Sequence, residues 1–451
     1  MIPLIVDSVL TNTKAYINGQ IVDCSIAIEE GKIQKIGKET QMPNADQKID
    51  LHSLLVLPGL IDEHVHLRDE GRAYKEDFSS GTASAAAGGF TTVLDMPNND
   101  PVTMSILTLQ NRMGVAQRKI IVNVGFFSEF PRKLDELEEI FEVGAVGLKL
   151  FMGNQIGGLN IDDDQTVSEG CKRVAKFKVP LAVHAEDRAM LAGNEEKLRL
   201  SKKSGSADFL RAHNEAVELK AIQRLLKVSE STGVHLHFCH VSTEDGLNAI
   251  SEAKTSGRTV TCEVTANHLM LSTDDLYRYG QMAIMAPPLR SKPHVDALWR
   301  GVEDGSIDAL GSDHAPHAQE EKSASSIWDV KVGVPGLETT LPIMLTQVKK
   351  NRLALSQVVK LLAEKPAEIF GLKYRGRLEK GNNADFTIVD FNCHFKIQAS
   401  KFKSKAKFSL FDGWEVWGKP VKTIVNGQLV FDEGEILSKG GSGFIIRRNS
   451  M

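Results

Sequence analysis

The chain has 451 residues, of which 42% are hydrophobic and 25% are charged. This composition is typical of a soluble globular protein with one large domain and a smaller one, and it excludes intrinsic disorder and collagen-like repetition. Its 54 Lys and Arg residues nearly balance its 58 Asp and Glu residues, for a net charge of -4. That balance excludes a chain-wide basic surface for nucleic acid or an anionic membrane.

The N-terminal segment has no basic stretch followed by a signal-type apolar core. No apolar run approaches the roughly 18 residues of a membrane span, so we expect a cytoplasmic protein. The five cysteines are scattered and form no CxxC pair. This pattern disfavours both a disulfide framework and a thiolate zinc site.

Residues 1–53 predict short antiparallel strands, because alternating apolar residues are punctuated by turn signals such as Asn18-Gly19. Residues 376–451 carry the same pattern, with Asn426-Gly427 as a turn. Each half is too small for a core of its own. We therefore predict one composite β-sandwich made by both chain ends, since two separate appendages would each leave an apolar sheet face uncovered. The basic stretch 401–407 is expected to be a solvated loop.

Between these ends, residues 54–375 alternate short apolar runs with longer amphipathic stretches, which indicates βα units and a parallel sheet. Several runs end abruptly in His, Asp, Asn or Lys, as buried strands with chemistry at their C-terminal ends do. Eight such units predict a (β/α)8 TIM barrel. The runs are LLVLPGLID, TTVLDMPNN, KIIVNVGFF, AVGLKLFMG, VPLAVHAED, VHLHFCHVS, TVTCEVTANH and DALGSDHAPH.

His64 and His66 stand two residues apart on the first predicted barrel strand, so their side chains share one face and can converge on a metal ion. A structural, hydrogen-bonded histidine pair is an equally good interpretation of this motif alone. Other strand ends supply further ligand types, which favours a dinuclear metal centre. Zinc suits these residues best, with Mn, Fe or Co as alternatives. The further residues are Lys149, His184, His240 and Asp313.

The sixth strand carries three histidines. Alternation places His235, His237 and Cys239 on one face and Phe238 and His240 on the other, and only His240 lies at the C-terminal end. We expect His235 and His237 to be packed or hydrogen-bonded between sheet and helices. The histidines without a strand-end position are expected to be structural or on the surface: His52, His213, His294 and His394.

Lys149 is unusual, because an ammonium group among apolar strand residues is costly to bury. From the residues alone, it either extends to water or pairs with an acid.

Nine segments in order along the chain resemble those of the dihydroorotases of the amidohydrolase superfamily. The resemblance covers most of the chain and implies a barrel with a composite β-sandwich. The segments are HVHLRDEG (64–71), DMPNNDP (95–101), GLKLFMG (147–153), HAED (184–187), HVS (240–242), CEVTANHL (262–269), APPLR (286–290), SDHAPH (312–317) and GVPGLETTLP (333–342).

The resemblance also assigns roles by position. It implies two zinc ions bridged by Lys149 as a carboxylated lysine. His64, His66 and Asp313 would bind one ion, and His184 and His240 the other. It further implies substrate contacts from Arg68, Asn98, His317, Val332 and Gly333.

Two departures from the family pattern concern the substrate side. Met285-Ala286 stand where many dihydroorotases have Asn, so a ring contact from that strand is missing. The common CEVTPHH reads CEVTANH here, with Ala266 and Asn267 changed. His268 still matches and is expected to form part of the site wall.

Dihydroorotase closes N-carbamoyl-L-aspartate to dihydroorotate, reversibly, in pyrimidine synthesis. The resemblance implies a hydroxide shared by two metal ions as the nucleophile, since metal binding lowers the pKa of water to about 7. Asp313 would then take and return the proton, although capping of a helix is the generic role of such an Asp. The guanidinium of Arg68 would bind the substrate carboxylate, with a surface ion pair as its alternative.

The sequence leaves three alternatives to a dihydroorotase. Allantoinase and dihydropyrimidinase share the barrel and the metals. A metal-free homologue could instead be a structural partner of aspartate carbamoyltransferase, but all six ligand positions are filled. The expected partner is a small-molecule substrate, with no nucleic acid and no membrane, and both a homo-oligomer and association with aspartate carbamoyltransferase stay open.

Overall fold

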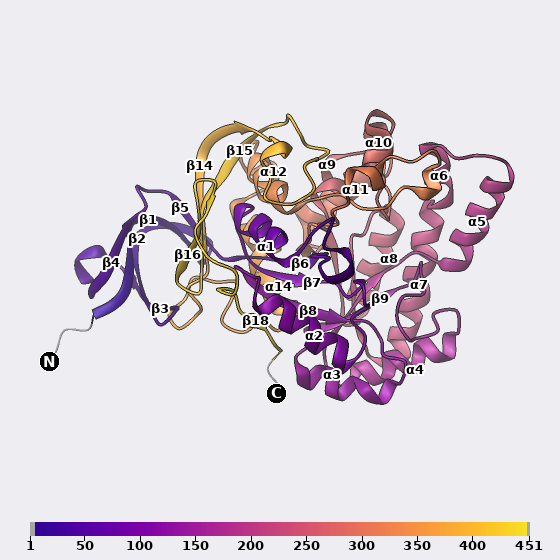
Figure 1. Ribbon diagram of the computed structural model, residues 1–451, viewed down its shortest axis with the longest axis horizontal. Helices are drawn as coiled ribbons and strands as arrows, with labels where there is room; N and C mark the ends of the chain where they lie inside the picture. Colours follow the sequence, from indigo (N-terminus) through magenta and orange to yellow (C-terminus); the bar gives the residue numbers. More distant parts are fainter. Residues whose placement is uncertain (1–4, 449–451) are drawn as a thin grey trace.

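The computed structural model describes residues 5–448. Figure 1 shows a barrel wrapped in helices and, beside it, a sheet in which strands from the two ends of the chain lie together. The predicted (β/α)8 TIM barrel with a composite β-structure from both chain ends is confirmed.

The eight barrel strands follow one another around the sheet in chain order, and neighbours pair in parallel. The segment after the last strand closes the ring, because Val65 bridges His314 in parallel and the His66 N–H donates to the His314 carbonyl at 2.9 Å. The strands are β6 (Leu60–Val65), β7 (Phe90–Asp95), β8 (Asn123–Ser128), β9 (Gly147–Phe151), β10 (Pro180–His184), β11 (His235–Phe238), β12 (Val260–Val264) and β13 (Ala309–Leu310).

Helices follow the strands and cover the outer face of the barrel, and many begin at a side-chain cap such as Asp77, Ser105 or Thr243. None of the helices within residues 5–448 is long and apolar enough to cross a membrane. They are α1 (Phe78–Ala87), α2 (Ile106–Gln117), α3 (Leu137–Val143), α4 (Asp164–Ala175), α5 (Arg188–Leu200), α6 (Ser206–Ala212), α7 (Glu215–Thr232), α8 (Glu244–Thr255), α9 (Ala266–Met270), α10 (Thr273–Tyr279), α11 (Lys292–Asp304), α12 (Leu337–Lys349), α13 (Leu355–Val359) and α14 (Lys365–Ile369).

The barrel strands are buried on both faces, which explains their continuous apolar runs. All of the strands contribute to the main core with the helices, and several also contribute to a separate interior cluster that includes Ile61, Leu94 and Phe127. Phe370, just after α14, belongs to this interior cluster, with its ring 5.5 Å from that of Phe127. Apolar side chains thus fill part of the barrel interior.

The composite sheet runs β17-β16-β15-β14-β5-β1-β2-β3, with β4 paired to β1. Leu10 and Ile26 from the first strands share one buried cluster with Phe386 and Ile424 from the last, so neither end forms a separate appendage. The strands are β1 (Ile5–Ile17), β2 (Gln20–Glu29), β3 (Lys32–Gly37), β4 (Asn44–Asp50), β5 (Leu55–Pro58), β14 (Phe386–Lys396), β15 (Glu415–Val425), β16 (Gln428–Asp432) and β17 (Glu435–Ile436).

The chain passes from sheet to barrel at Gly59. β5 pairs with β14 and β1, so it belongs to the composite sheet although it falls within the predicted barrel segment. A Cβ atom at Gly59 would lie 2.3 Å from Thr91 Oγ1 and 2.7 Å from Asp385 Cβ, so this crossing requires glycine. At the other end, β18 (Ile445–Ile446) returns to the barrel and pairs with β8.

The basic stretch 401–407 is not the solvated loop that its charge predicted. Phe402, Ser404 and Ala406 are buried between its lysines. Glu338 of α12 accepts hydrogen bonds from the backbone N–H groups of Lys403 and Ser404, at 2.7 and 3.2 Å, and from the Ser84 hydroxyl of α1 at 2.9 Å. We call these contacts of Ser84, Glu338, Lys403 and Ser404 the junction.

Candidate active site

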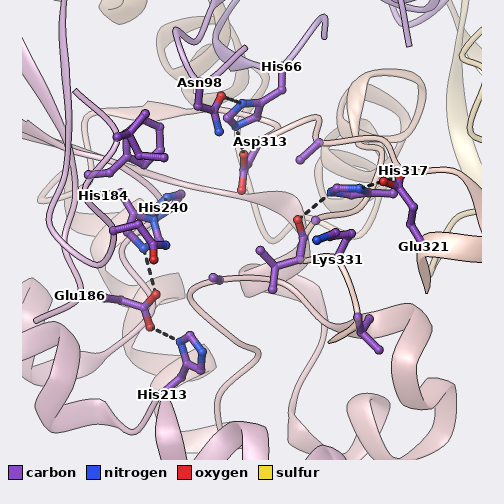
Figure 2. A pocket seen from close by; sticks show the side chains of 18 of the residues that line it. His66, Asn98, His184, Glu186, His213, His240, Asp313, His317, Glu321 and Lys331 are labelled. Carbon is purple, nitrogen blue, oxygen red and sulfur yellow. Dashed lines mark hydrogen bonds and ion pairs between the residues drawn. The ribbon is translucent and has the colours of Figure 1, made fainter. Parts of the chain in front are cut away.

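A cavity of about 540 Å³ opens at the C-terminal end of the barrel strands. Figure 2 shows histidine and carboxylate side chains from different strand ends around it. Five of the six predicted metal ligands line this cavity, and the sixth, Lys149, is fully buried on β9. The five are His64, His66, His184, His240 and Asp313.

His66 has one ring nitrogen bound to an amide and the other facing a carboxylate. Its Nδ1–H donates to Asn98 Oδ1 at 2.7 Å, which leaves the Nε2 electron pair 3.0 Å from Asp313 Oδ1 (Figure 2). Burial lowers the pKa of His66 to about 4, so the ring is neutral at pH 7. An electron pair and a carboxylate oxygen that face each other are two acceptors, and a cation between them satisfies both.

His64 is held in the same way. Its Nδ1–H donates to Glu263, and its Nε2 lies 3.4 Å from the same Asp313 Oδ1. Glu263 is fully buried and also accepts from His237 Nε2 at 3.1 Å. Sequence reasoning did not select Glu263, although an acid inside the apolar run TVTCEV was a usable signal.

His184 and His240 form the second group. His184 Nδ1 lies 3.1 Å from His240 Nε2, a separation at which both nitrogens can bind one ion. On the other side of its ring, His184 Nε2–H donates to Glu186 at 2.9 Å, and Glu186 accepts a second hydrogen bond from His213 Nδ1 at 2.7 Å (Figure 2). Glu186 and His213 were missed from the sequence, although Glu186 lies in the segment HAED.

These residues fit divalent cations. Potential ligand atoms of His64, His66 and Asp313 lie within 4.8 Å of one another. The outer nitrogens of His64, His66 and His184 are bound to a carboxylate or an amide, which is how proteins orient metal-binding imidazoles. Imidazole nitrogen and carboxylate oxygen together suit zinc, and also Mn, Fe or Co.

Lys149 has neither of the structural roles considered for it. Its side chain does not reach water, and its Nζ donates to Cys239 Sγ at 2.9 Å. Within the described part of the chain, no carboxylate lies within 4.0 Å of this Nζ. An ammonium group in such a place is costly to keep.

Three predicted site residues adopt left-handed backbone conformations: Arg68 (φ 56°), His240 (φ 35°) and Asp313 (φ 45°). Such strained residues cluster at functional sites. The turn at His240 also explains why simple alternation misplaces its side chain. β11 ends at Phe238, and the turn after it brings the His240 ring to His184.

Arg68 is a buried cation at the cavity wall. Its Nε approaches the Pro316 carbonyl at 3.4 Å, and its Nη2 lies 3.4 Å from His317 Nε2. Over residues 5–448, no carboxylate comes within 4.0 Å of the guanidinium, so the predicted alternative of a surface ion pair is wrong. Burial lowers the pKa of Arg68 only to about 10, so it stays charged.

His317 lies between charged neighbours. Burial, and then Arg68 and Lys75, lower its pKa to about 3, so the ring is neutral. Its Nδ1 accepts from Lys75 Nζ at 3.1 Å, and its Nε2–H donates to the Val332 carbonyl at 2.9 Å. Lys75 in turn pairs with Glu321 at 2.8 Å.

The remaining predicted substrate residues also line the cavity. Val332 and Gly333 form one part of the wall, and a Cβ atom at Gly333 (φ 133°) would lie 2.7 Å from that of Ala315. At the position where many dihydroorotases have Asn, Met285 is buried and Ala286 presents a methyl group to the cavity. No polar side chain replaces the family's ring contact at these two positions.

The prediction that His235 and His237 lie between sheet and helices is wrong for His237. Its ring is 5.3 Å from Phe370 in the barrel interior, and its Nε2 bonds to Glu263. The physical reason is that Glu263, buried inside the barrel, needs donors there. His235 is half-buried and bonds to Thr261 Oγ1 at 3.0 Å.

His213, expected to be structural or on the surface, is buried and bonded to Glu186, and it also lines the cavity. His268, expected in the site wall, lies behind it, where its nitrogens bond to Thr265 Oγ1 and the Pro287 carbonyl. His52 and His394 are exposed as expected.

A TIM barrel with histidines, an aspartate and a buried lysine at its strand ends has the arrangement of an enzyme whose active site lies at the carboxyl end of the barrel. Residues 55–430 match the amidohydrolase family. The chain belongs to that family.

Relatives and solved structures with different activities are similar to this chain. A dihydroorotase of Methanosarcina mazei is 36% identical over 444 residues, which cover 96% of both chains. An L-hydantoinase of Paenarthrobacter aurescens is 34% identical over 98% of both chains. Among solved structures, an L-hydantoinase (dihydropyrimidinase) from Arthrobacter aurescens superposes with a TM-score of 0.94 at 33% identity, covering 98% of this chain and all of that one.

Proposed function

We propose that the chain is a dihydroorotase, which closes N-carbamoyl-L-aspartate to (S)-dihydroorotate plus water, and opens it again, in the synthesis of UMP. Arg68 carries this proposal. Its guanidinium is buried at the cavity, and in the described chain no carboxylate pairs with it. Dihydroorotate brings a carboxylate that most other cyclic amides lack, and a guanidinium is suited to bind it through two parallel hydrogen bonds.

The proposal includes two divalent cations, zinc in the first place. His64, His66 and Asp313 would hold one, His184 and His240 the other, and a carboxylated Lys149 would bridge them. When bound, such ions lower the pKa of water to about 7 and polarise a carbonyl group. Carboxylation would also replace the buried ammonium of Lys149 with an anion, which removes the cost of leaving it without an acid partner.

Asp313 is the proposed proton carrier. Its side chain is 18% exposed, so part of the carboxylate faces the cavity while Oδ1 faces His64 and His66. In ring closure it would take the proton from the attacking amide nitrogen, and in ring opening it would return a proton to the leaving nitrogen.

A hydantoinase is the second candidate, and the cavity itself supports it. Apolar residues also line the cavity, and a cyclic amide with a large apolar substituent would pack against them. The 34% identity to an L-hydantoinase supports the same interpretation. The apolar residues are Phe151, Ile156, Leu191, Phe209 and Trp328.

A substrate comparison tests the proposal. Hydrolysis of dihydroorotate, dihydrouracil, allantoin and an L-hydantoin with an apolar substituent is measured on one preparation, with elemental analysis of protein purified without chelator. We expect a clear preference for dihydroorotate and about two metal ions per chain. A preference for the hydantoin would support the second candidate. Absence of both metal and turnover would support a catalytically inactive partner of aspartate carbamoyltransferase instead.

A further inference from the structure

Lys322 is a buried lysine whose partners are all backbone carbonyl groups. Its side chain is 1% exposed, and its Nζ donates to the carbonyls of Ile284, Lys331 and Gly333 at 2.7, 3.0 and 3.0 Å. An ammonium group has three N–H donors, so each is used. No carboxylate of residues 5–448 lies within 4.0 Å of this Nζ, so Lys322 is not part of an ion pair.

The three carbonyls belong to two separate segments of the cavity wall. Lys331 and Gly333 flank Val332, whose own carbonyl accepts from His317 instead. Ile284 lies two residues before Ala286, and its carbonyl also accepts from the Gly333 N–H at 3.0 Å. The ammonium of Lys322 therefore ties the 331–333 segment to the 284–286 segment at one point.

We propose that Lys322 is a positioning residue for the substrate, acting through these two wall segments. A cyclic amide presents N–H and C=O groups in one plane, and backbone groups recognise them only when held within a few tenths of an ångström of the right place. Val332 and Gly333 line the cavity, and the carbonyls of Lys331 and Gly333 accept from Lys322 on the other side of the segment. Without the ammonium, the Lys331 and Gly333 carbonyls would lose this donor and the Ile284 carbonyl would keep only the Gly333 N–H, so the two wall segments would be less firmly joined. The inference rests on the proposed function only in taking the substrate to be a cyclic amide.

The test compares Lys322→Met, which keeps the length of the side chain but removes its donors, with Lys322→Arg, whose planar donors cannot converge on three carbonyls. Lys350→Met, at an exposed position on the end of α12, is the matched control. Amide hydrogen exchange is followed across the chain, and metal content, kcat and KM are measured on the cyclic amide that the unmodified protein hydrolyses best.

In Lys322→Met we expect exchange to rise at 331–334 and 284–286 only, with metal content unchanged. KM should rise about tenfold or more while kcat changes less than about threefold, because binding is lost in the ground state and the transition state alike. Lys322→Arg should give values of KM and of amide exchange between those of Lys322→Met and those of the unmodified protein.

Unchanged exchange and KM in Lys322→Met would overturn the inference. So would a rise in exchange throughout the barrel with equal losses in kcat and metal content, because that result marks a merely structural role. If Lys322→Met does not fold, Lys322→Arg decides by the same readouts. If the unmodified protein hydrolyses no cyclic amide, the proposed function has failed, and the exchange pattern alone still decides whether Lys322 holds the two segments together.

Discussion

The cavity and the junction both bury ionisable groups, but these groups have different partners in the two places. At the junction, Glu338 is met by three hydrogen-bond donors from α1 and the 401–407 segment. At the cavity, Arg68 and Lys149 are buried with no carboxylate within 4.0 Å in the described structure. A buried ionisable group with its hydrogen bonds satisfied can stabilise a fold, whereas a buried cation with no carboxylate beside it is a cost that a ligand or metal can offset. Stability and function therefore depend on different buried charges in this chain.

This contrast gives a rule for substitutions. Changes at the cavity should lower activity and leave the free energy of unfolding equal or higher, since strained and unpaired groups are removed. Changes at the junction should alter stability and leave specificity alone. Four variants test the rule, from the largest expected effect to the smallest.

Asp313→Asn should lower kcat by about 1,000-fold, because an amide can neither take nor return a proton. Its melting temperature should not fall. Steady-state kinetics on dihydroorotate and a thermal unfolding curve check both statements. An undiminished kcat would assign the proton transfer to another residue.

Lys149→Ala should lower activity by more than about 100-fold by removing the proposed bridge between two metal ions. Added short carboxylic acids should restore a little activity by taking the place of the bridge. Mass spectrometry under gentle conditions should find a labile carbon dioxide adduct on the unmodified protein. Full activity of the variant with both metals bound would refute carboxylation of Lys149.

Arg68→Ala should lower kcat/KM for dihydroorotate by about 10- to 150-fold, since a charge-assisted hydrogen bond contributes roughly 1.5–3 kcal/mol. Turnover of dihydrouracil, the same ring without the carboxylate, should change little. Arg300→Ala, at an exposed position, is the control. Equal losses on the two substrates would mean that Arg68 supports the site rather than binding the carboxylate.

Glu338→Gln should leave kcat/KM within about twofold and change only the pH dependence of stability. Burial raises the pKa of Glu338 from its ordinary 4.5 to about 7. The folded state therefore binds the Glu338 proton more tightly than the unfolded state does. The protonated carboxyl group contributes to the free energy of unfolding in full below pH 4.5, and this contribution is lost as the pH rises to about 7. The loss amounts to about 3 kcal/mol.

Urea unfolding at pH 4.5, 6 and 8 measures the effect. The unmodified protein should lose this free energy of unfolding across the interval, and Glu338→Gln should lose about 3 kcal/mol less. Glu368→Gln, on the surface, should behave like the unmodified protein. An identical pH dependence in Glu338→Gln would show that the junction does not hold a protonated carboxyl group.

Much of the fold was predictable, because the eight barrel strands are apolar runs whose ends carry the polar residues. His64, His66, His184, His240 and Asp313 stand at such ends, and the structure brings them to one cavity. The left-handed turns at His240 and Asp313 could not be read from alternation, because alternation holds only inside a strand.

The supporting groups were harder to predict. Glu263 bonds to His64, 199 residues away, so its importance depends on closure of the barrel, whereas Glu186 bonds to His184 two residues away and to His213 27 residues away. Lys322 acts on carbonyl groups, which every residue possesses and no sequence motif marks. The burial of every second residue in the stretch 401–407 was not predicted, because the lysines between these residues dominate its composition.

The composite sheet also constrains synthesis on the ribosome. β5 lies between β1 and β14, so β5 gains its second neighbour only after the whole barrel has been translated. At about 5–20 residues per second, this delay is on the order of tens of seconds. During that time the β5 edge, with its buried Val56 and Leu57, is open to pairing with other chains. The order of synthesis therefore leaves one strand edge of the composite sheet unpaired until β14 has been made.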